Sequence, residues 1–326
     1  MPTIEVKGLT KSFRTYKKAP GFRGALRGLF HRRYEQSVAV KEISFSVEEG
    51  ELVGFLGPNG AGKTTTLKML SGLLHPSGGS ASVLGYVPWQ RANGYRRQFS
   101  LLLGQKNQLW WDLPARESLD LNARIYGIPE AHFLRTVDEL TEMLMVRHKL
   151  DVMVRELSLG ERMKMELIAA LLHQPKVLFL DEPTIGLDVV SQKTVREFLK
   201  LHNQTRKTTI LLTSHYMADI QELCQRVVII DQGSIFFDGR LEEIVDRFAD
   251  SKVVTIQCPE ALTTPEGPLL EHGEIMERTE GMLKLKVRRE KVIPACKSLL
   301  EHLKVTDIDI QETPIEDVIR QLFQHH

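Results

Sequence analysis

The fold is decided by Glu51–Leu56 (ELVGFL), by the loop Gly57–Thr64 (GPNGAGKT) that follows it, and by the helical pattern TTLKMLSGL after the loop. An apolar run that ends in a glycine-rich turn predicts a buried strand. A strand, the pattern G-x-x-x-x-G-K-[ST] and a helix form a phosphate-binding loop, because glycines let successive backbone N–H groups point at phosphate oxygens. We expect Lys63 to pair with the β- and γ-phosphates and Thr64 to hold Mg²⁺. The residues predicted to surround a nucleotide are Gly57, Pro58, Asn59, Gly60, Ala61, Gly62, Lys63, Thr64 and Thr65.

Two acids, Asp181 and Glu182, stand at the end of the next buried run, Val177–Leu180 (VLFL). Ligands of an open parallel sheet bind at the carboxyl ends of its strands. We therefore expect Asp181 to bind Mg²⁺ and Glu182 to be the general base that deprotonates an attacking water. The alternative is that the two acids only cap the helix that follows.

Strands alternate with helices along most of the chain, which predicts a parallel α/β sheet. Thr209–Leu212 (TILL) is the third buried run. Between the first two runs, Phe133, Val137, Leu140 and Leu144 recur at helical spacing and would form one buried face. We expect a mainly helical subdomain over about residues 113–175, inserted into the α/β core.

The pattern changes after residue 250. Residues 253–256, 283–287 and 308–310 read as strands, residues 294–303 and 314–323 read as helices, and 263–268 (TTPEGP) reads as a loop. The expected organisation is a first domain over residues 1–245 and a small C-terminal α/β domain over residues 251–326.

Length and charge agree with two domains and exclude several classes of protein. The chain has 326 residues, with 43 Lys and Arg against 42 Asp and Glu. This near-equality of basic and acidic residues excludes a chain that is disordered, or binds polyanions, over its whole length. The three cysteines form no disulfide framework or zinc motif, which favours a reducing compartment. Neither a signal peptide nor an apolar run of about 20 residues is visible, so a membrane role would be peripheral or act through a partner.

Residues 6–34 form a basic stretch without an acid, and the predicted insert covers about residues 14–36. Within it, Phe22, Leu26, Leu29 and Phe30 recur at helical spacing among arginines. A basic amphipathic helix can lie on an anionic membrane surface. The alternatives are a solvated basic loop and a helix packed on its own domain.

A further motif, Leu157–Arg162 (LSLGER), opens a helix predicted over residues 163–172. Ser158 and Gly160 at a helix N-terminus would form a second anion-binding surface. An ordinary helix cap is the alternative interpretation.

Four motifs of the sequence, taken in their order along the chain, resemble those of the ATP-binding-cassette (ABC) ATPases. The four elements are the phosphate loop at 57–64, LSLGE at 157–161, LFLDEP at 178–183 and TSH at 213–215, and the likeness extends over residues 3–240. The resemblance implies a P-loop NTPase (RecA-like) α/β core with antiparallel β and helical subdomains. It also implies that ATP is hydrolysed by head-to-tail pairs of such domains.

The resemblance also implies roles for single residues. Gln105 would contact Mg²⁺ and water, and His215 would contact the γ-phosphate. Ser158, Gly160, Glu161 and Asp188 would face the nucleotide held by the partner subunit, and Phe13 would stack on adenine, with Tyr16 and Tyr34 as rivals. Leu159 and Glu161 replace the usual glycine and glutamine of the signature.

The GPNGAGKTTTLKMLSGLL run and the small C-terminal domain resemble ABC-2-type exporter ATPases, and QKNQLWWDLP and PTIGLDVV resemble a bacterial group compared with drug, daunorubicin-type or viologen exporters. The implied partners are a second ATPase subunit, expected as a homodimer, and integral membrane permease subunits at the cytoplasmic face of the plasma membrane. Trp110 and Trp111 would lie either at that contact or inside the helical subdomain. Two alternatives stay open: an importer ATPase with a regulatory C-terminal domain, and a soluble ABC ATPase acting on ribosomes or nucleic acid. No nucleic-acid partner is expected, because the basic stretch lacks the interleaved aromatics of a stacking platform.

Overall fold

The computed structural model describes residues 2–16, 34–104, 107–214, 216–259 and 273–324. The chain divides into two compact units, residues 1–239 and residues 240–326. The sequence predicted that the first domain ends at residue 245. The observed boundary lies between residues 239 and 240, so the helix at 241–248 belongs to the second unit. In the described ranges, no helix combines the length and the apolar character that a membrane crossing requires.

A six-stranded sheet forms the centre of the first unit, in the order β5-β6-β7-β3-β8-β9. Neighbouring strands from β5 to β8 run parallel, as the alternation of strands and helices predicted. Strands β3, β6 and β7 are buried along their whole length, because helices and the second sheet cover both faces. The strands are β3 (Leu52–Leu56), β5 (Phe99–Leu103), β6 (Val177–Asp181), β7 (Thr209–Thr213), β8 (Arg226–Asp231) and β9 (Ser234–Arg240).

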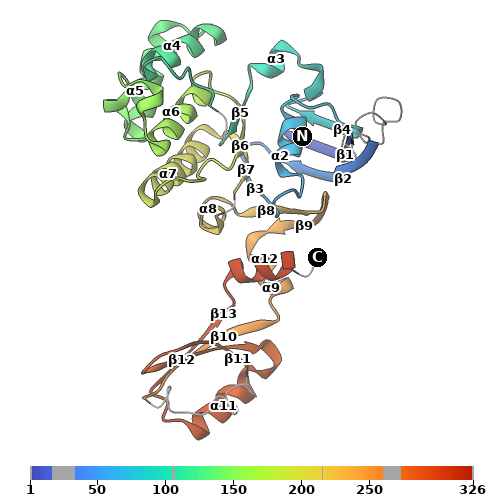
Figure 1. The fold of residues 1–326 in the computed structure, drawn as a ribbon, viewed down its shortest axis with the longest axis vertical. Helices are drawn as coiled ribbons and strands as arrows, with labels where there is room; N and C mark the ends of the chain where they lie inside the picture. The colour runs from blue at the N-terminus through green and yellow to red at the C-terminus, as the bar shows by residue number, and fades with distance from the viewer. Residues whose placement is uncertain (1, 17–33, 105–106, 215, 260–272, 325–326) are drawn as a thin grey trace, which may run out of the picture. The chain divides into compact units, whose positions relative to one another are not determined.

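On one side of this sheet lies an antiparallel sheet of order β2-β1-β4 together with helix α2 (Figure 1). Its strands are β1 (Ile4–Tyr16), β2 (Tyr34–Val47) and β4 (Gly78–Val83), and α2 spans Lys63–Leu70. Alternate residues of β1, among them Ile4 and Val6, are buried in one apolar cluster with Val53 and Phe55 of β3. The antiparallel sheet therefore shares its core with the strand that leads into the phosphate loop.

The basic stretch is not one separate segment. Residues 6–16 belong to β1, and the predicted insert begins and ends inside a paired hairpin, since Arg14 lies opposite Gln36 and Tyr16 opposite Tyr34. Strands pair through their backbone N–H and C=O groups, whatever the charge of their side chains. Charge alone was therefore a poor guide to where the insert begins and ends. The predicted amphipathic helix with Phe22, Leu26, Leu29 and Phe30 lies outside the described residues and stays a prediction.

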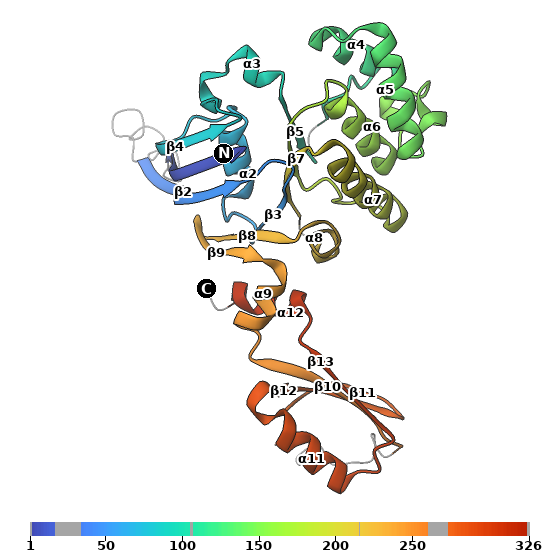
Figure 2. The ribbon, with the colours of Figure 1, turned by 180° about the vertical axis from the view of Figure 1, so that it is seen from behind.

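Helices cover the other side of the central sheet, as Figures 1 and 2 show from opposite directions. Phe133, Val137, Leu140 and Leu144 are buried, which confirms the predicted apolar face. The helices are α4 (Ala115–Tyr126), α5 (Glu130–Met143), α6 (Leu159–Leu171) and α7 (Val189–Arg206). Two shorter helices, α3 (Asn93–Arg96) and α8 (Met217–Leu223), complete the first unit as described.

The second unit is a four-stranded antiparallel sheet, of order β11-β12-β10-β13, with helix α11 on one face. The strands and the two helices predicted there correspond to β10, β12, β13, α11 and α12. Strand β11 was missed because its sequence, EIMER, does not alternate apolar and polar residues. The predicted loop at 263–268 lies outside the described residues. The elements are α9 (Leu241–Phe248), β10 (Ser251–Gln257), β11 (Glu274–Arg278), β12 (Met282–Arg288), α11 (Val292–His302), β13 (Asp307–Glu312) and α12 (Ile315–Gln324).

Candidate functional site

The sheet brings the phosphate loop and the two acids together. Strand β7 lies between β3, which leads into the loop, and β6, which ends at Asp181. Thr64 Oγ1 lies 3.0 and 2.8 Å from the two carboxylate oxygens of Asp181, and Thr213 Oγ1 donates to Asp181 Oδ1 at 2.8 Å. Two oxygen-bearing side chains that were expected to share a metal ion are therefore direct neighbours.

Lys63 is buried in the curve of the loop that precedes it. Its amine donates hydrogen bonds to the carbonyl oxygens of Gly57 at 2.6 Å and Pro58 at 3.1 Å. Burial lowers the pKa of Lys63, and the nearby carboxylates of Glu182 and Asp181 act in the opposite direction. The loop thus holds an ammonium group beside both acids, where a polyphosphate would meet it.

Two of the loop glycines, Gly57 and Gly62, are required by close backbone approach. A Cβ at Gly62, where φ is +110°, would lie 2.5 Å from the carbonyl oxygen of Ala39 on β2. A Cβ at Gly57 would lie 2.1 Å from the carbonyl oxygen of Ile230 on β8. Only glycine lets the loop run between these two strands and then enter α2.

Glu182 has a left-handed backbone, with φ of +56°. Its N–H lies 3.1 Å from both the carbonyl oxygen and the hydroxyl of Thr213, so β7 stabilises this conformation. Non-glycine residues with such a φ are uncommon and concentrate at functional sites. The backbone at Glu182 therefore departs from the extended conformation of β6, in which side chains alternate between the two faces.

Gly104 was not singled out from the sequence, although it links the end of β5 to the acids. Its N–H donates to the carbonyl oxygen of Asp181 at 2.8 Å, and a Cβ there would lie 2.4 Å from the carbonyl oxygen of Glu182. The signal was available in the glycine of LLLGQ, which stands directly before Gln105. Gln105 and His215 themselves lie outside the described residues, so their placement stays a prediction.

The signature motif opens α6 four residues earlier than predicted, at Leu159. Ser158 is the N-cap: its hydroxyl accepts from the Glu161 N–H at 3.3 Å, and the Glu161 carboxylate accepts from the Ser158 N–H at 2.9 Å. Lys149 pairs with Glu161 at 3.0 Å. The glutamate that departs from the usual signature thus completes a capping box, which places the motif in the first helical turn.

The turn before α7 packs against the start of α6. Asp188 caps α7 by accepting from the Ser191 N–H at 2.9 Å, and this hydrogen bonding lowers the pKa of Asp188. A Cβ at Gly160 would lie 2.4 Å from the Ser191 hydroxyl and 3.4 Å from an Asp188 carboxylate oxygen. Gly160 is therefore needed for packing within the chain, and Ser158, Gly160, Glu161 and Asp188 form one group.

Phe13 lies on β1, paired with Ser37 of β2, and the ring is 40% exposed. The adjacent stretch of β2 contains Ala39, which contacts the phosphate loop at Gly62. The Lys11 amine lies 5.3 Å from the centre of the Phe13 ring. An exposed aromatic face therefore lies on the hairpin that borders the loop.

Glu166 on α6 is a buried acid that was not noticed in the run ELIAALL. The side chain is only 2% exposed and accepts a backbone hydrogen bond from Gln108. Burial raises its pKa to about 7, against the opposing effects of Arg162 and of that hydrogen bond. The acid thus ties the signature helix to the segment that follows residue 105.

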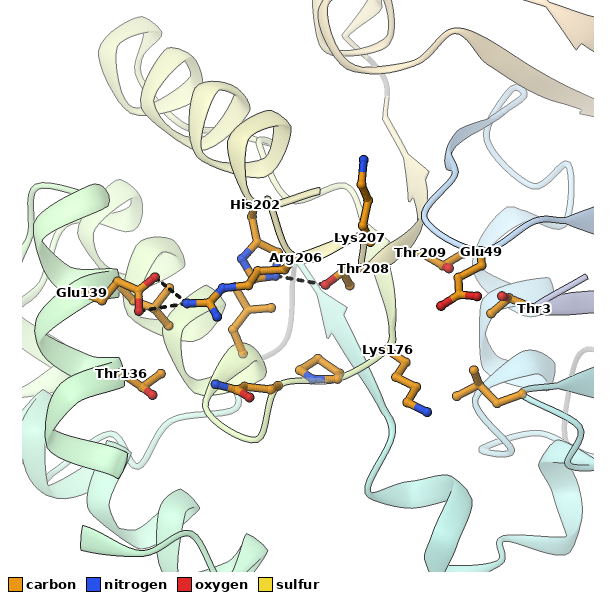
Figure 3. Close-up of a pocket in the computed structure, with 15 residues that line it drawn as sticks. Thr3, Glu49, Thr136, Glu139, Lys176, His202, Arg206, Lys207, Thr208 and Thr209 are labelled. Carbon is orange, nitrogen blue, oxygen red and sulfur yellow. Dashed lines mark hydrogen bonds and ion pairs between the residues drawn. The ribbon is translucent and has the colours of Figure 1, made fainter. Parts of the chain in front are cut away.

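A cavity of about 430 Å³ lies elsewhere in this unit, at the amino ends of β6 and β7 (Figure 3). Its charged groups do not converge: Arg206 pairs with Glu139 at 2.7 Å, and the amines of Lys176 and Lys207 point in opposite directions. Asp181 and Thr213 are at the carboxyl ends of the same two strands. The cavity is therefore not part of the nucleotide site.

The chain is similar to ATP-binding proteins of transporters. The family profile described as "ABC transporter" matches residues 40–185, and one described as "EvrA-like ABC transporter, C-terminal domain" matches residues 250–311. The ABC transporter ATP-binding protein NatA of Bacillus subtilis is 35% identical over 208 residues, which are 64% of this chain and 84% of NatA. A Nod factor export ATP-binding protein I of Burkholderia thailandensis is 37% identical over 76% of this chain and 82% of its own length.

Solved structures show the same fold. A structure described as the ATP-binding subunit of an ABC transporter superposes with a TM-score of 0.62 at 29% identity, covering 76% of this chain and 93% of the other. The ATP-binding cassette MJ0796 bound to ADP and Pi gives a TM-score of 0.61 at 20% identity, covering 73% and 98%. The second likeness concerns the fold alone.

Replacing Glu166 with Gln will stabilise the chain at neutral and alkaline pH. Because the folded pKa lies above the ordinary value of 4.5, the unfolded chain loses its proton first, and the free energy of unfolding falls as the pH rises from 4.5 to 7. Gln keeps the acceptor for Gln108 and carries no charge. At pH 8 we expect a gain of about 1–3 kcal/mol in denaturant unfolding, which disappears near pH 5. Glu142→Gln, at an exposed acid of α5, is the control; an equal gain at both pH values would contradict the prediction.

Proposed function

The chain belongs to the ATP-binding proteins of ABC transporters, and on that premise we propose that it hydrolyses ATP to power an exporter through separate membrane subunits. The observation that carries the proposal is the meeting of Lys63, Thr64, Asp181 and Glu182 at the carboxyl edge of the parallel sheet. This edge is where an α/β sheet binds its ligands.

Export is favoured by the names of the relatives. One is a Nod factor export protein, and another, with 29% identity over 89% of this chain, is the linearmycin resistance ATP-binding protein LnrL of Bacillus subtilis. Neither an importer nor a ribosome- or nucleic-acid-bound ATPase has comparable support. The proposed location is the cytoplasmic face of the plasma membrane, reached through the membrane subunits.

Nucleotide binding follows from the loop and its lysine. When phosphates displace the carbonyl oxygens of Gly57 and Pro58 as partners, the Lys63 ammonium can pair with the β- and γ-phosphates. The N–H groups of residue 57 and of residues 59–65, at the N-terminus of α2, would supply further donors. The exposed ring of Phe13 would stack on the adenine.

The oxygen ligands suit Mg²⁺, which prefers hydroxyl, carboxylate and water oxygens. Thr64 Oγ1 and the Asp181 carboxylate already face each other, and we propose them as its ligands together with Gln105. The ion would neutralise charge on the β- and γ-phosphates. Thr213 holds the Asp181 carboxylate in place from β7.

Hydrolysis then needs a base for one water molecule. The Glu182 carboxylate would take a proton as the water oxygen bonds to the γ-phosphorus and the bond to the bridging oxygen of ADP breaks. The left-handed backbone of Glu182 is stabilised by Thr213 for this purpose, at the cost of local strain. Gln105 and His215 are proposed to contact the water and the γ-phosphate.

A second subunit would complete each site. We propose that Ser158, Gly160, Glu161 and Asp188 face the nucleotide bound by the partner copy, because Ser158 and Glu161 cap the start of α6 and Gly160 lies against Asp188 at the start of α7. The free end of a helix offers N–H donors to a phosphate. The pair is proposed to be a homodimer.

The membrane subunit would dock on the helical subdomain. Trp110 and Trp111 are 41% and 43% exposed, which argues against the alternative that they are buried there. The Arg162 guanidinium lies 5.3 Å from the Trp111 ring and so links this surface to α6. Exposed tryptophans are typical anchors at protein interfaces.

Replacing Glu182 with Gln will lower ATP turnover by about 100-fold or more, since the base is lost, and leave ATP binding intact. Phosphate release and titration with a fluorescent ATP analogue measure the two quantities. Glu197→Gln, at an exposed acid of α7, is the matched control and should behave as wild type. Turnover of the Glu182 variant at the wild-type rate would refute its role as base.

Replacing both Trp110 and Trp111 with Ala will weaken binding to the membrane subunit but not ATP binding, because the anchors lie away from the loop. The measurement is recovery of a multi-span membrane protein with the tagged Glu182→Gln chain, from gently solubilised membranes with ATP and Mg²⁺. Leu73→Ala, at an exposed residue, is the control. Recovery of ribosomes or nucleic acid instead would favour the alternative function.

A further inference from the structure

Asp219, on α8, is a fully buried acid with partners on three other segments of the chain. The side chain is 0% exposed. Its Oδ2 accepts hydrogen bonds from the hydroxyls of Thr184 and of Ser214, the latter at 2.6 Å. Its Oδ1 accepts from Arg196 Nη1 of α7 at 3.1 Å. Such a carboxylate is tolerated in a protein core only when its partners replace water.

Thr184 belongs to the turn that joins Glu182 to Asp188. The Ile185 N–H donates to the carbonyl oxygen of Glu182 at 3.3 Å, and the Leu187 N–H donates to that of Thr184 at 3.2 Å. Asp188 then caps α7 beside Gly160. A shift of Thr184 would therefore be passed to the residues proposed to face the partner copy.

Ser214 is the first residue after β7 and directly precedes His215. Its hydroxyl accepts from the Tyr216 N–H at 3.0 Å and lies 3.3 Å from the Tyr216 carbonyl oxygen. Ser214 is thus tied to the backbone of Tyr216 and to the side chain of Asp219, both of which follow residue 215. A shift of Ser214 would be passed to the residue proposed to contact the γ-phosphate.

The two hydroxyls share a single carboxylate oxygen, so a displacement of that oxygen changes both contacts. Arg196 limits the freedom of Asp219 itself, because its Nε is held by Glu222 Oε2 at 2.6 Å. Of these groups, Asp219 and Glu222 stand on α8 and Arg196 on α7. The arrangement is a bridge of side chains between the turn that follows β6 and the segment that follows β7.

We propose that Asp219 is a positioning residue that couples the loop of Ser214 and His215 to the turn of Thr184 and Asp188. In a pair of subunits, the contact that one chain makes to the γ-phosphate would then change together with the contact that the same chain makes to its partner. This inference rests on the proposed ATPase function. Asp219 itself touches neither nucleotide nor metal in this scheme.

A double-mutant cycle on the full chain tests the bridge. Thr184→Val, Ser214→Ala and the double variant are assayed for ATP hydrolysis with Mg²⁺. Because the two hydrogen bonds act in series, each single variant should lower kcat by about ten-fold with KM for ATP nearly unchanged, and the double variant should lower kcat no further. Losses that multiply to about 100-fold in the double variant, or no loss in either single variant, would overturn the inference.

Two controls separate coupling from a merely structural role. Thr141→Val removes another buried hydroxyl, which in α5 donates only to carbonyl oxygens of its own helix, and it should leave kcat unchanged. The cooperativity of hydrolysis with ATP concentration should fall toward a Hill coefficient of one in the Thr184 and Ser214 variants but not in Thr141→Val. If the loss of kcat follows the loss of thermal stability across all variants, the role is structural and the inference fails. An active wild type with an additive cycle overturns this inference alone, whereas an inactive wild type overturns the proposed function with it.

Discussion

The contact between Thr64 and Asp181 is the interaction on which the rest of the site depends. It exists only if β3 and β6 are placed on either side of β7 with their carboxyl ends level. Strand β7 contributes Thr213 to the same carboxylate and to the backbone of Glu182, so one buried strand positions both acids. The burial of β3, β6 and β7 on both faces supplies the apolar stabilisation that holds this edge rigid.

Two features of the helical side extend this geometry toward a partner. The capping box of Ser158 and Glu161 brings the signature to the start of α6, and the packing of Gly160 on Ser191 holds α7 beside it. Glu166 then ties α6 to Gln108, while Gly104 ties the other end of that short segment to Asp181. Gly104 is therefore held by the acids and Gln108 by the signature helix.

Much of the fold could be predicted because its signals are local. Apolar runs bounded by turns located β3, β6 and β7, and helical periodicity at Phe133, Val137, Leu140 and Leu144 located a buried helix. The boundary of the basic stretch was wrong, since residues 6–16 pair in a hairpin whose partner strand lies across the insert. The start of α6 was also placed too late, because the capping box depends on a side chain three residues further along.

The sequence by itself determined the chemistry of the nucleotide loop, since glycines, lysine and threonine at fixed spacing have one common use before a helix. It also placed acids at the end of a buried strand. Only the tertiary structure showed that Thr213 and Gly104 contact Asp181 and that Glu166 and Asp219 are buried acids. Each of these acts through a contact with a residue distant in sequence, such as Asp219 with Thr184 or Gly104 with Asp181. Such contacts depend on how strands and helices pack, and no periodicity or motif records them.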